Sequence, residues 1–166
     1  MQMPVEIAKL AHDVIAALKV GNLTIATAES CTGGLVAGAL TSVSGSSEAV
    51  YGGFVTYANE AKIAMLGVPY GLLRQFGAVS KEVAIAMAEG ALAAAGTHVA
   101  VAVTGIAGPL GGSAQRPVGL VHFAVATTED SRHLKKSFDP NWSREQIRQA
   151  SVIEALKLVK KALAAA

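Results

Sequence analysis

The sequence predicts an α/β fold, a three-layer α/β/α sandwich whose sheet is mixed and mostly parallel. Helical and strand-like segments alternate through most of the 166 residues, which is the order that α/β layered folds produce. The segment at 99–103 is almost entirely apolar, as expected for a strand that is covered on both faces. The segment at 132–138 follows its neighbour after a short connection. We therefore expect an antiparallel hairpin there, which makes the sheet mixed.

The first half of the chain contains alternating helical and strand-like segments. Apolar side chains recur on one helical stripe from residue 5, and Gly21-Asn22 follows as a stop signal. Three helices are expected, at 5–19, at 35–43 and from Asn59 to about Gly67. Two strands, rich in apolar, aromatic or β-branched residues, are expected at 23–28 and 51–57.

The second half begins with residues 70–78, whose pattern favours neither a helix nor a strand. Ser80 is a suitable N-cap for a long alanine-rich helix that extends to about Ala95. Ser143 is the expected N-cap of a final helix that ends near Leu163. Three further strands are expected, at 99–103, 117–127 and 132–138.

Length, composition and charge restrict the class of protein. We expect one domain over residues 1–166, because a chain of this length with 52% hydrophobic residues can bury a full core. The net charge of +2 is too small to indicate nucleic-acid binding. The single cysteine excludes an internal disulfide, and the N-terminus resembles neither a signal peptide nor a membrane span. We therefore expect a cytoplasmic protein that binds no membrane, and the alanine content and apolar stripes favour a homo-oligomer.

Two junctions between a strand and a turn contain the residues that are best suited to catalysis or ligand binding. They are ATAESCTGG at 26–34 and VAVTGIAGP at 101–109. In an open α/β sheet, ligands bind at the carboxyl ends of strands. Adjacent glycines let backbone N–H groups point at one spot, and a helix that starts there adds partial positive charge. The pattern is typical of an anion site, although a tight turn without a ligand explains the glycines equally well.

Ser30, Cys31 and Thr32 place three potential nucleophiles side by side in the first turn. A hydroxyl needs a base to remove its proton, and the four histidines do not indicate a Ser-His-Asp triad. Lys62 is the better candidate for the base. A strand that ends at Tyr57 would hold both side chains at the same rim of the sheet, and burial lowers the pKa of a lysine. A solvated lysine and a core tyrosine are the alternative interpretations.

Three arginines are candidate partners for a phosphate or carboxylate, because a guanidinium offers a bidentate fork. They are Arg116, Arg144 and Arg148. The last two are four residues apart and share one face of the final helix, which a solvated stripe would also explain. No histidine, cysteine or carboxylate group has the spacing of a metal site, so neither a metal nor a cofactor is expected.

Six motifs in this order resemble the CinA C-terminal domain family, the family of competence- and damage-inducible protein A: TAESCTGG, GGFVTYANEAK, GAVS, VTGIAGP, PVGLVHFA and a closing RQA-AL pattern. The resemblance covers about residues 5–163. It implies a nicotinamide-nucleotide amidohydrolase of bacterial pyridine nucleotide (NAD) salvage. Such an enzyme converts nicotinamide mononucleotide to nicotinate mononucleotide and ammonia. Many relatives carry this domain behind a larger domain that resembles a molybdopterin-binding fold, which we expect this chain to lack.

The resemblance also implies roles for individual residues. Ser30 is the expected nucleophile, and Lys62 and Tyr57 are expected to assist it. The residues expected at the substrate site are Thr32, Gly33, Gly34, Ser47, Thr104, Gly105 and Arg148. On this hypothesis the N–H groups of residues 32–34 stabilise the oxyanion, while Thr104 and Arg148 hold the 5′-phosphate. Leu110 stands where relatives commonly have an aspartate, so no acid is expected to act at that position.

Three alternatives stay open. Cys31 is an alternative nucleophile, since a thiolate at the start of a helix has a lowered pKa. A second hypothesis is a non-catalytic, nucleotide-binding regulatory module linked to competence or the DNA damage response. A third is a partner in DNA uptake or repair. That role predicts a basic surface, and the net charge of +2 argues against it.

Overall fold

Five strands form one sheet in the computed structural model, which describes residues 2–165. They are β1 (Ile25–Glu29), β2 (Val50–Val55), β3 (Val99–Gly105), β4 (Leu120–Thr127) and β5 (Ser131–Ser137). The spatial order is β2-β1-β3-β4-β5. β1 pairs in parallel with β2 and β3, whereas β4 is antiparallel to both β3 and β5. Four of the five strands therefore run in one direction, and the sheet is mixed as the sequence predicts.

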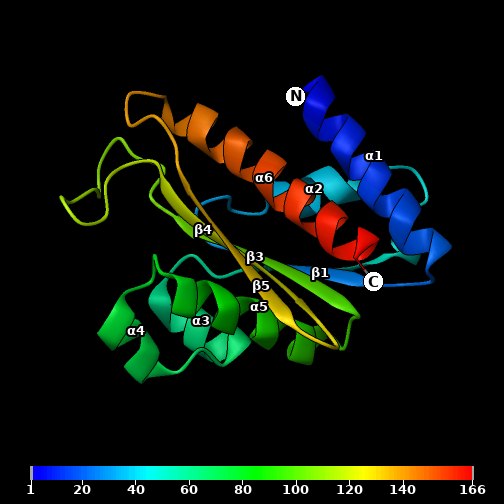
Figure 1. Ribbon diagram of the computed structural model, residues 1–166, viewed down its shortest axis with the longest axis horizontal. Helices are drawn as coiled ribbons and strands as arrows, with labels where there is room; N and C mark the ends of the chain where they lie inside the picture. The colour runs from blue at the N-terminus through cyan, green and yellow to red at the C-terminus, as the bar shows by residue number, and fades with distance from the viewer. Residues whose placement is uncertain (1, 166) are drawn as a thin grey trace.

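Helices cover both faces of this sheet (Figure 1). One layer contains α1 (Val5–Val20), α2 (Leu35–Thr41) and α6 (Arg144–Ala164). The other layer contains α3 (Asn59–Leu66), α4 (Tyr70–Phe76) and α5 (Lys81–Ala95). A short 3-10 turn, η1 (Ser46–Glu48), precedes β2. The predicted three-layer α/β/α sandwich is thereby confirmed.

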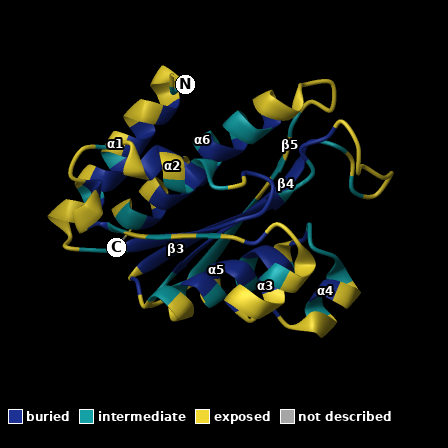
Figure 2. Cartoon of the chain, turned by 180° about the vertical axis from the view of Figure 1, so that it is seen from behind, coloured by how far each residue is buried: buried dark blue, intermediate teal, exposed yellow. Residues whose placement is uncertain are grey.

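The sheet separates two apolar cores. On β4, alternate side chains belong to different cores: Val121, Phe123 and Val125 to that of α1 and α6, Ala124 and Ala126 to that of α5. Figure 2 shows the buried residues gathered along the sheet and on the inward sides of the helices. The strand residues that face α5 in its core are alanines, so small side chains separate this helix from the sheet.

Most elements begin and end close to their predicted limits, and the helix caps explain why. The Ser80 hydroxyl accepts a hydrogen bond from the Val83 N–H at 3.3 Å, and Ser143 forms a reciprocal capping box with Gln146. Residues 70–78, which the sequence left unassigned, contribute α4. β4 starts three residues later than predicted, because the Leu120 N–H closes a turn onto the Pro117 carbonyl at 3.1 Å.

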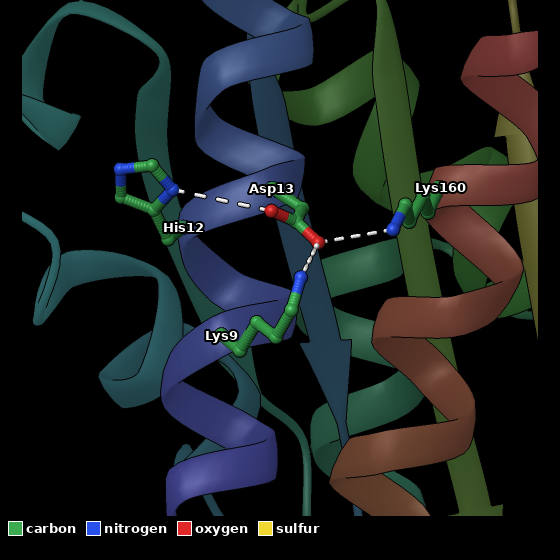
Figure 3. Close-up of polar contacts among 4 residues, drawn as sticks. All are labelled: Lys9, His12, Asp13 and Lys160. Carbon is green, nitrogen blue, oxygen red and sulfur yellow. Dashed lines mark hydrogen bonds and ion pairs between the residues drawn. The ribbon is translucent and has the colours of Figure 1, made fainter.

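Polar contacts join α1 to α6 at the surface (Figure 3). The Asp13 carboxylate accepts hydrogen bonds from Lys160 of α6 at 3.0 Å and from Lys9 of α1 at 3.1 Å. His12 Nδ1 lies 4.0 Å from the other carboxylate oxygen. The hydrogen bond from Lys160 is the largest cause that lowers the pKa of Asp13 below its ordinary value of 3.8. The carboxylate therefore stays charged at neutral pH and ties the first helix to the last.

Candidate active site

A cavity of about 260 Å³ lies beyond the carboxyl ends of the parallel strands. Ser30 reaches it from the turn after β1, Lys62 from α3, and Tyr57 from the connection between β2 and α3. The loop at 105–111, which follows β3, lines the cavity as well. These segments meet because the last residue of β1 pairs with β2 on one side and β3 on the other, so the chain leaves all three strands at one edge.

The side chains of Lys62 and Ser30 are in contact. Lys62 Nζ lies 3.1 Å from Ser30 Oγ, and it also donates to the backbone carbonyl oxygens of Thr56 at 2.8 Å and Tyr57 at 3.2 Å. Lys62 is only 1% exposed, and within residues 2–165 its hydrogen-bond partners are all neutral groups. Burial is the main cause that lowers the pKa of Lys62 below 10.5.

The lowered pKa of Lys62 favours the neutral form of this amine. The contacts by themselves also fit a charged amine, whose three N–H groups would donate to all three oxygens. A neutral amine has two N–H groups and one lone pair. The two carbonyl oxygens can only accept hydrogen bonds, so they take both N–H groups. The lone pair is then left for the hydroxyl hydrogen of Ser30. In this arrangement Lys62 can remove a proton from Ser30.

The other two potential nucleophiles of the turn are enclosed. Burial raises the pKa of the Cys31 thiol to about 12, so the thiol stays protonated at neutral pH. The Thr32 side chain is completely buried, and its hydroxyl has no hydrogen-bond partner in the described part of the chain. Of the three, only Ser30 contacts the buried amine.

The two-glycine turn binds a carboxylate of the protein itself. Glu29 is 1% exposed and accepts hydrogen bonds from three backbone N–H groups at the start of α2. The donors are Gly34 at 3.2 Å, Val36 at 2.9 Å and Ala37 at 3.0 Å. The Thr27 hydroxyl adds a fourth hydrogen bond at 3.0 Å. The anion site that the sequence predicts at this helix start is therefore filled by Glu29, and not left open for a substrate.

The remaining residues expected at the substrate site lie in different surroundings. Gly105 lines the cavity. Thr104 is buried, and its hydroxyl donates to the Ala78 carbonyl at 2.9 Å. Arg148 donates from Nε to the Cys31 carbonyl at 3.1 Å and lines a second cavity, of about 500 Å³, between α1, α2 and α6. Thr104 and Arg148 thus stand beside the Ser30 cavity without lining it.

Ser47 lies outside this cavity, contrary to the expectation from sequence. It belongs to η1, which precedes β2, whereas the cavity lies beyond the end of that strand. A strand of six residues spans about 20 Å. Because Ser47 precedes the strand that leads to Tyr57, the order of the sequence already places it at the opposite end of that strand.

Arg144 is the cationic residue that lines the Ser30 cavity. Its Nη1 donates to the Gly108 carbonyl at 2.8 Å, and its Nη2 donates to the Tyr57 hydroxyl at 3.1 Å. The guanidinium thereby joins the two walls of the cavity. It is the Tyr57 backbone carbonyl, and not the hydroxyl, that contacts Lys62. Sequence spacing named both arginines of this helix as candidates, but it could not tell which one would face the cavity.

Two further properties of the described chain bear on function. Residues 2–165 contain no group of three or more His, Cys, Asp and Glu side chains arranged to hold a metal ion. Nor does any helix in this part of the chain combine the length and the apolar character of a membrane-crossing segment.

Comparison with known proteins gives a consistent result. Residues 7–163 match the family model described as the CinA C-terminal domain. A CinA-like protein of Synechococcus sp. (strain RCC307) is 51% identical over 91% of this chain, and the chain spans about a third of the length of such curated relatives (36% for this one). The crystal structure of the competence/damage inducible protein CihA from Agrobacterium tumefaciens has a TM-score of 0.94 at 48% identity, covering 98% of this chain and 99% of that one. The competence damage-inducible protein A (ComA) from Klebsiella pneumoniae has a TM-score of 0.91 at 34% identity, covering 95% and 97%.

Proposed function

The chain belongs to the CinA C-terminal domain family, and we propose that it is an amidase acting on nicotinamide mononucleotide. The products are nicotinate mononucleotide and ammonia. The observation that carries the proposal is the 3.1 Å contact between Ser30 Oγ and the buried amine of Lys62, at the edge of a cavity. The substrate comes from the family resemblance, and the chemistry comes from this pair.

The first half of the reaction forms an acyl-enzyme. Neutral Lys62 removes the hydroxyl proton of Ser30, and Ser30 Oγ attacks the carboxamide carbon of the nicotinamide ring. The carbonyl oxygen becomes an oxyanion, which backbone N–H groups stabilise. Lys62 then gives its proton to the amide nitrogen, the C–N bond breaks, and ammonia leaves.

The second half returns the enzyme to its starting state. A water molecule enters where ammonia left, and Lys62 removes a proton from it. The hydroxide attacks the ester carbon, the bond to Ser30 Oγ breaks, and Lys62 returns the proton to Ser30. Each half therefore uses the same base in the same place, and Lys62 ends neutral.

The walls of the cavity suit a small anionic substrate. Arg144 uses two N–H groups on Gly108 and Tyr57, which leaves other donors of its guanidinium for a phosphate. The volume of about 260 Å³ lies near the lower end of the range for small-molecule sites. We therefore assign the phosphate contact to Arg144 and the reacting carboxamide to Ser30.

Ammonia release from nicotinamide mononucleotide by the purified protein tests this proposal. Ser30→Ala should lose at least about 1,000-fold in kcat, because both the nucleophile and the acyl-enzyme are removed. Cys31→Ala is the matched control, since it changes the adjacent residue and removes a thiol that is protonated at neutral pH. It should stay within about threefold of the wild-type kcat, because the group that attacks the substrate is retained.

Opposite behaviour of these two variants would transfer the nucleophile to Cys31. A folded wild-type protein that binds the nucleotide, as measured by calorimetry, but releases no ammonia would instead support a regulatory binding module. Near-normal turnover in Ser30→Ala would reject the proposed mechanism.

A further inference from the structure

We propose that Arg148 is a positioning residue that holds the oxyanion-binding N–H group of Cys31 in place, and that it does not bind the substrate phosphate. The inference rests on the proposed amidase function. It starts from the two backbone carbonyl oxygens that Arg148 contacts, those of Cys31 at 3.1 Å and Thr32 at 3.4 Å.

Most N–H groups of the turn are already used within the protein. The Gly33 N–H donates to the Ser30 carbonyl at 3.1 Å, and the Leu35 N–H donates to the Thr32 carbonyl at 2.9 Å. The Glu29 carboxylate accepts hydrogen bonds from the N–H groups of Gly34, Val36 and Ala37. Within residues 2–165, this leaves the N–H groups of Cys31 and Thr32 without a partner in the turn.

These two N–H groups follow the nucleophile directly in the chain. In hydrolases with a serine at a strand-to-helix turn, the N–H of the residue after the serine is one donor of the oxyanion hole. Unpaired backbone donors next to a reactive serine are what an oxyanion requires. Cys31 lines the cavity, whereas Thr32 is completely buried and does not line it, so the Cys31 N–H is the oxyanion donor that this turn offers.

Arg148 acts on this donor through the planarity of two successive peptide bonds. In a trans peptide, the C=O of one residue and the N–H of the next lie in one plane and point in opposite directions. The Thr32 carbonyl, which accepts a hydrogen bond from Arg148 Nη2, shares its plane with the Gly33 N–H, so this contact fixes the direction of the Gly33 N–H. In the same way, the Gly33 N–H bound to the Ser30 carbonyl fixes the direction of the Cys31 N–H.

The environment of Arg148 fits this role better than contact with a substrate phosphate. The side chain is half-buried and lines the cavity between α1, α2 and α6, not the cavity of Ser30 and Lys62. Arg144, one helical turn earlier, lines both. A Cβ added at Gly33 would lie 3.3 Å from Arg148 Nη2, so the turn and the guanidinium are packed closely. One arginine of the helix faces the substrate, and the other holds the turn from behind.

Two substrates that differ only in the 5′-phosphate distinguish positioning from phosphate binding. Steady-state ammonia release is measured with nicotinamide mononucleotide and with nicotinamide riboside, for wild type, Arg148→Met, Arg148→Lys and Arg144→Gln. Arg148→Met should lower kcat by about 100-fold on both substrates, the effect of one lost oxyanion donor. KM should change less than about threefold, and the preference for the phosphorylated substrate should be unchanged.

Arg148→Lys should recover part of the lost kcat, because an ammonium can still donate to one carbonyl. Arg144→Gln should behave differently, with a reduced preference for the phosphorylated substrate. A higher KM for the mononucleotide alone in Arg148→Met, with kcat retained, would overturn the inference and make Arg148 a phosphate ligand.

A second measurement does not depend on the identity of the substrate. The rate at which phenylmethylsulfonyl fluoride modifies Ser30 also depends on donors to the developing negative oxygen. This rate should fall at least tenfold in Arg148→Met, at a temperature where thermal denaturation shows the variant to be folded. An unchanged rate would overturn the inference even if wild type released no ammonia from either nucleotide, an outcome that would separately reject the proposed function.

Discussion

Burial has opposite effects on two neighbouring titratable side chains of the site. It lowers the pKa of Lys62 and raises the pKa of Cys31 to about 12, because a low-dielectric environment favours the uncharged form of each. A neutral amine is a base, whereas a neutral thiol is a weak nucleophile. The same physical cause therefore activates Ser30 through Lys62 and leaves Cys31 unreactive.

The pH dependence of the reaction should report the ionisation of Lys62. Only the neutral amine can accept the proton of Ser30, so kcat/KM should rise with pH and level off above a midpoint that lies below 10.5. Lys62→Arg should lose about 100-fold or more at every pH, because a guanidinium does not give up its proton in this range. Measured profiles of both proteins check this. An active Lys62→Arg variant with the wild-type profile would remove Lys62 from the role of base.

Residue types and spacing nominate Lys62 and a turn with three potential nucleophiles, from which the resemblance selects Ser30, but they do not assign the two arginines. Ser30 and Lys62 follow strands whose carboxyl ends must meet in a parallel sheet, so local pattern predicts their proximity. Arg144 and Arg148 are equivalent by helical spacing. Which one faces the cavity depends on how α6 is rotated against the sheet, and that is decided by packing across more than 100 residues of sequence.

At the scale of the element, α2 shows how a short helix can hold a catalytic turn. It has seven residues, and such a helix is unstable by itself in water. Glu29, from the end of β1, satisfies three of its first N–H groups and complements its positive end. The turn that contains Ser30 lies between Glu29 and α2. The hydrogen bonds from α2 to the Glu29 carboxylate therefore also restrain the nucleophile.

Removing this cap should cost stability in proportion to the hydrogen bonds lost. Glu29→Ala leaves three N–H groups unpaired, of which that of Val36 is buried and those of Gly34 and Ala37 are half-buried. An unpaired buried group costs about 1 kcal/mol or more, so we expect a total loss of about 2 kcal/mol. Glu29→Gln keeps one acceptor oxygen and should lose less. Urea denaturation measures both. Glu48→Gln is the control, since its carboxylate is exposed, and it should change stability by less than about 0.5 kcal/mol.

Equal stability of the Glu29 and Glu48 variants would show that the carboxylate does not hold α2. The sequence places an acid next to a serine, but it does not distinguish an acid that acts on a substrate from one that caps a helix. That distinction needs the positions of the N–H groups, which only the folded turn provides.

At the scale of the whole molecule, the sequence predicts the layers but not the order of the strands. Alternating elements and an apolar run at 99–103 are enough for a three-layer fold, because those patterns are local. The central place of β1 and β3, and the addition of β4 and β5 at one side, depend on contacts between distant segments. The predicted hairpin of β4 and β5 also brings two histidines together, and their contact depends on a register that the sequence pattern does not give.

His122 of β4 and His133 of β5 are hydrogen-bonded, with 2.9 Å between His122 Nδ1 and His133 Nε2. Burial, followed by the charge of His133, lowers the pKa of His122 to about 4. Burial, followed by the charge of Lys81, also lowers the pKa of His133. In a neutral pair, one ring donates and the other accepts, whereas two protonated rings would present only donors to each other. The folded protein therefore keeps this pair neutral where free histidines would bind protons.

This pair should make the whole molecule less stable as the pH falls. Histidines in the unfolded chain take up protons below about 6.5, but the folded pair does so only at lower pH, so protons bind preferentially to the unfolded state. The free energy of unfolding should thus fall between pH 7 and pH 5. It should fall less in a variant with both His122→Gln and His133→Gln. Urea denaturation at several pH values measures the difference. In a domain that unfolds cooperatively, a local difference in proton binding appears in the free energy of unfolding of the whole domain. Identical pH dependence in wild type and the double variant would show that the histidine pair has no such effect.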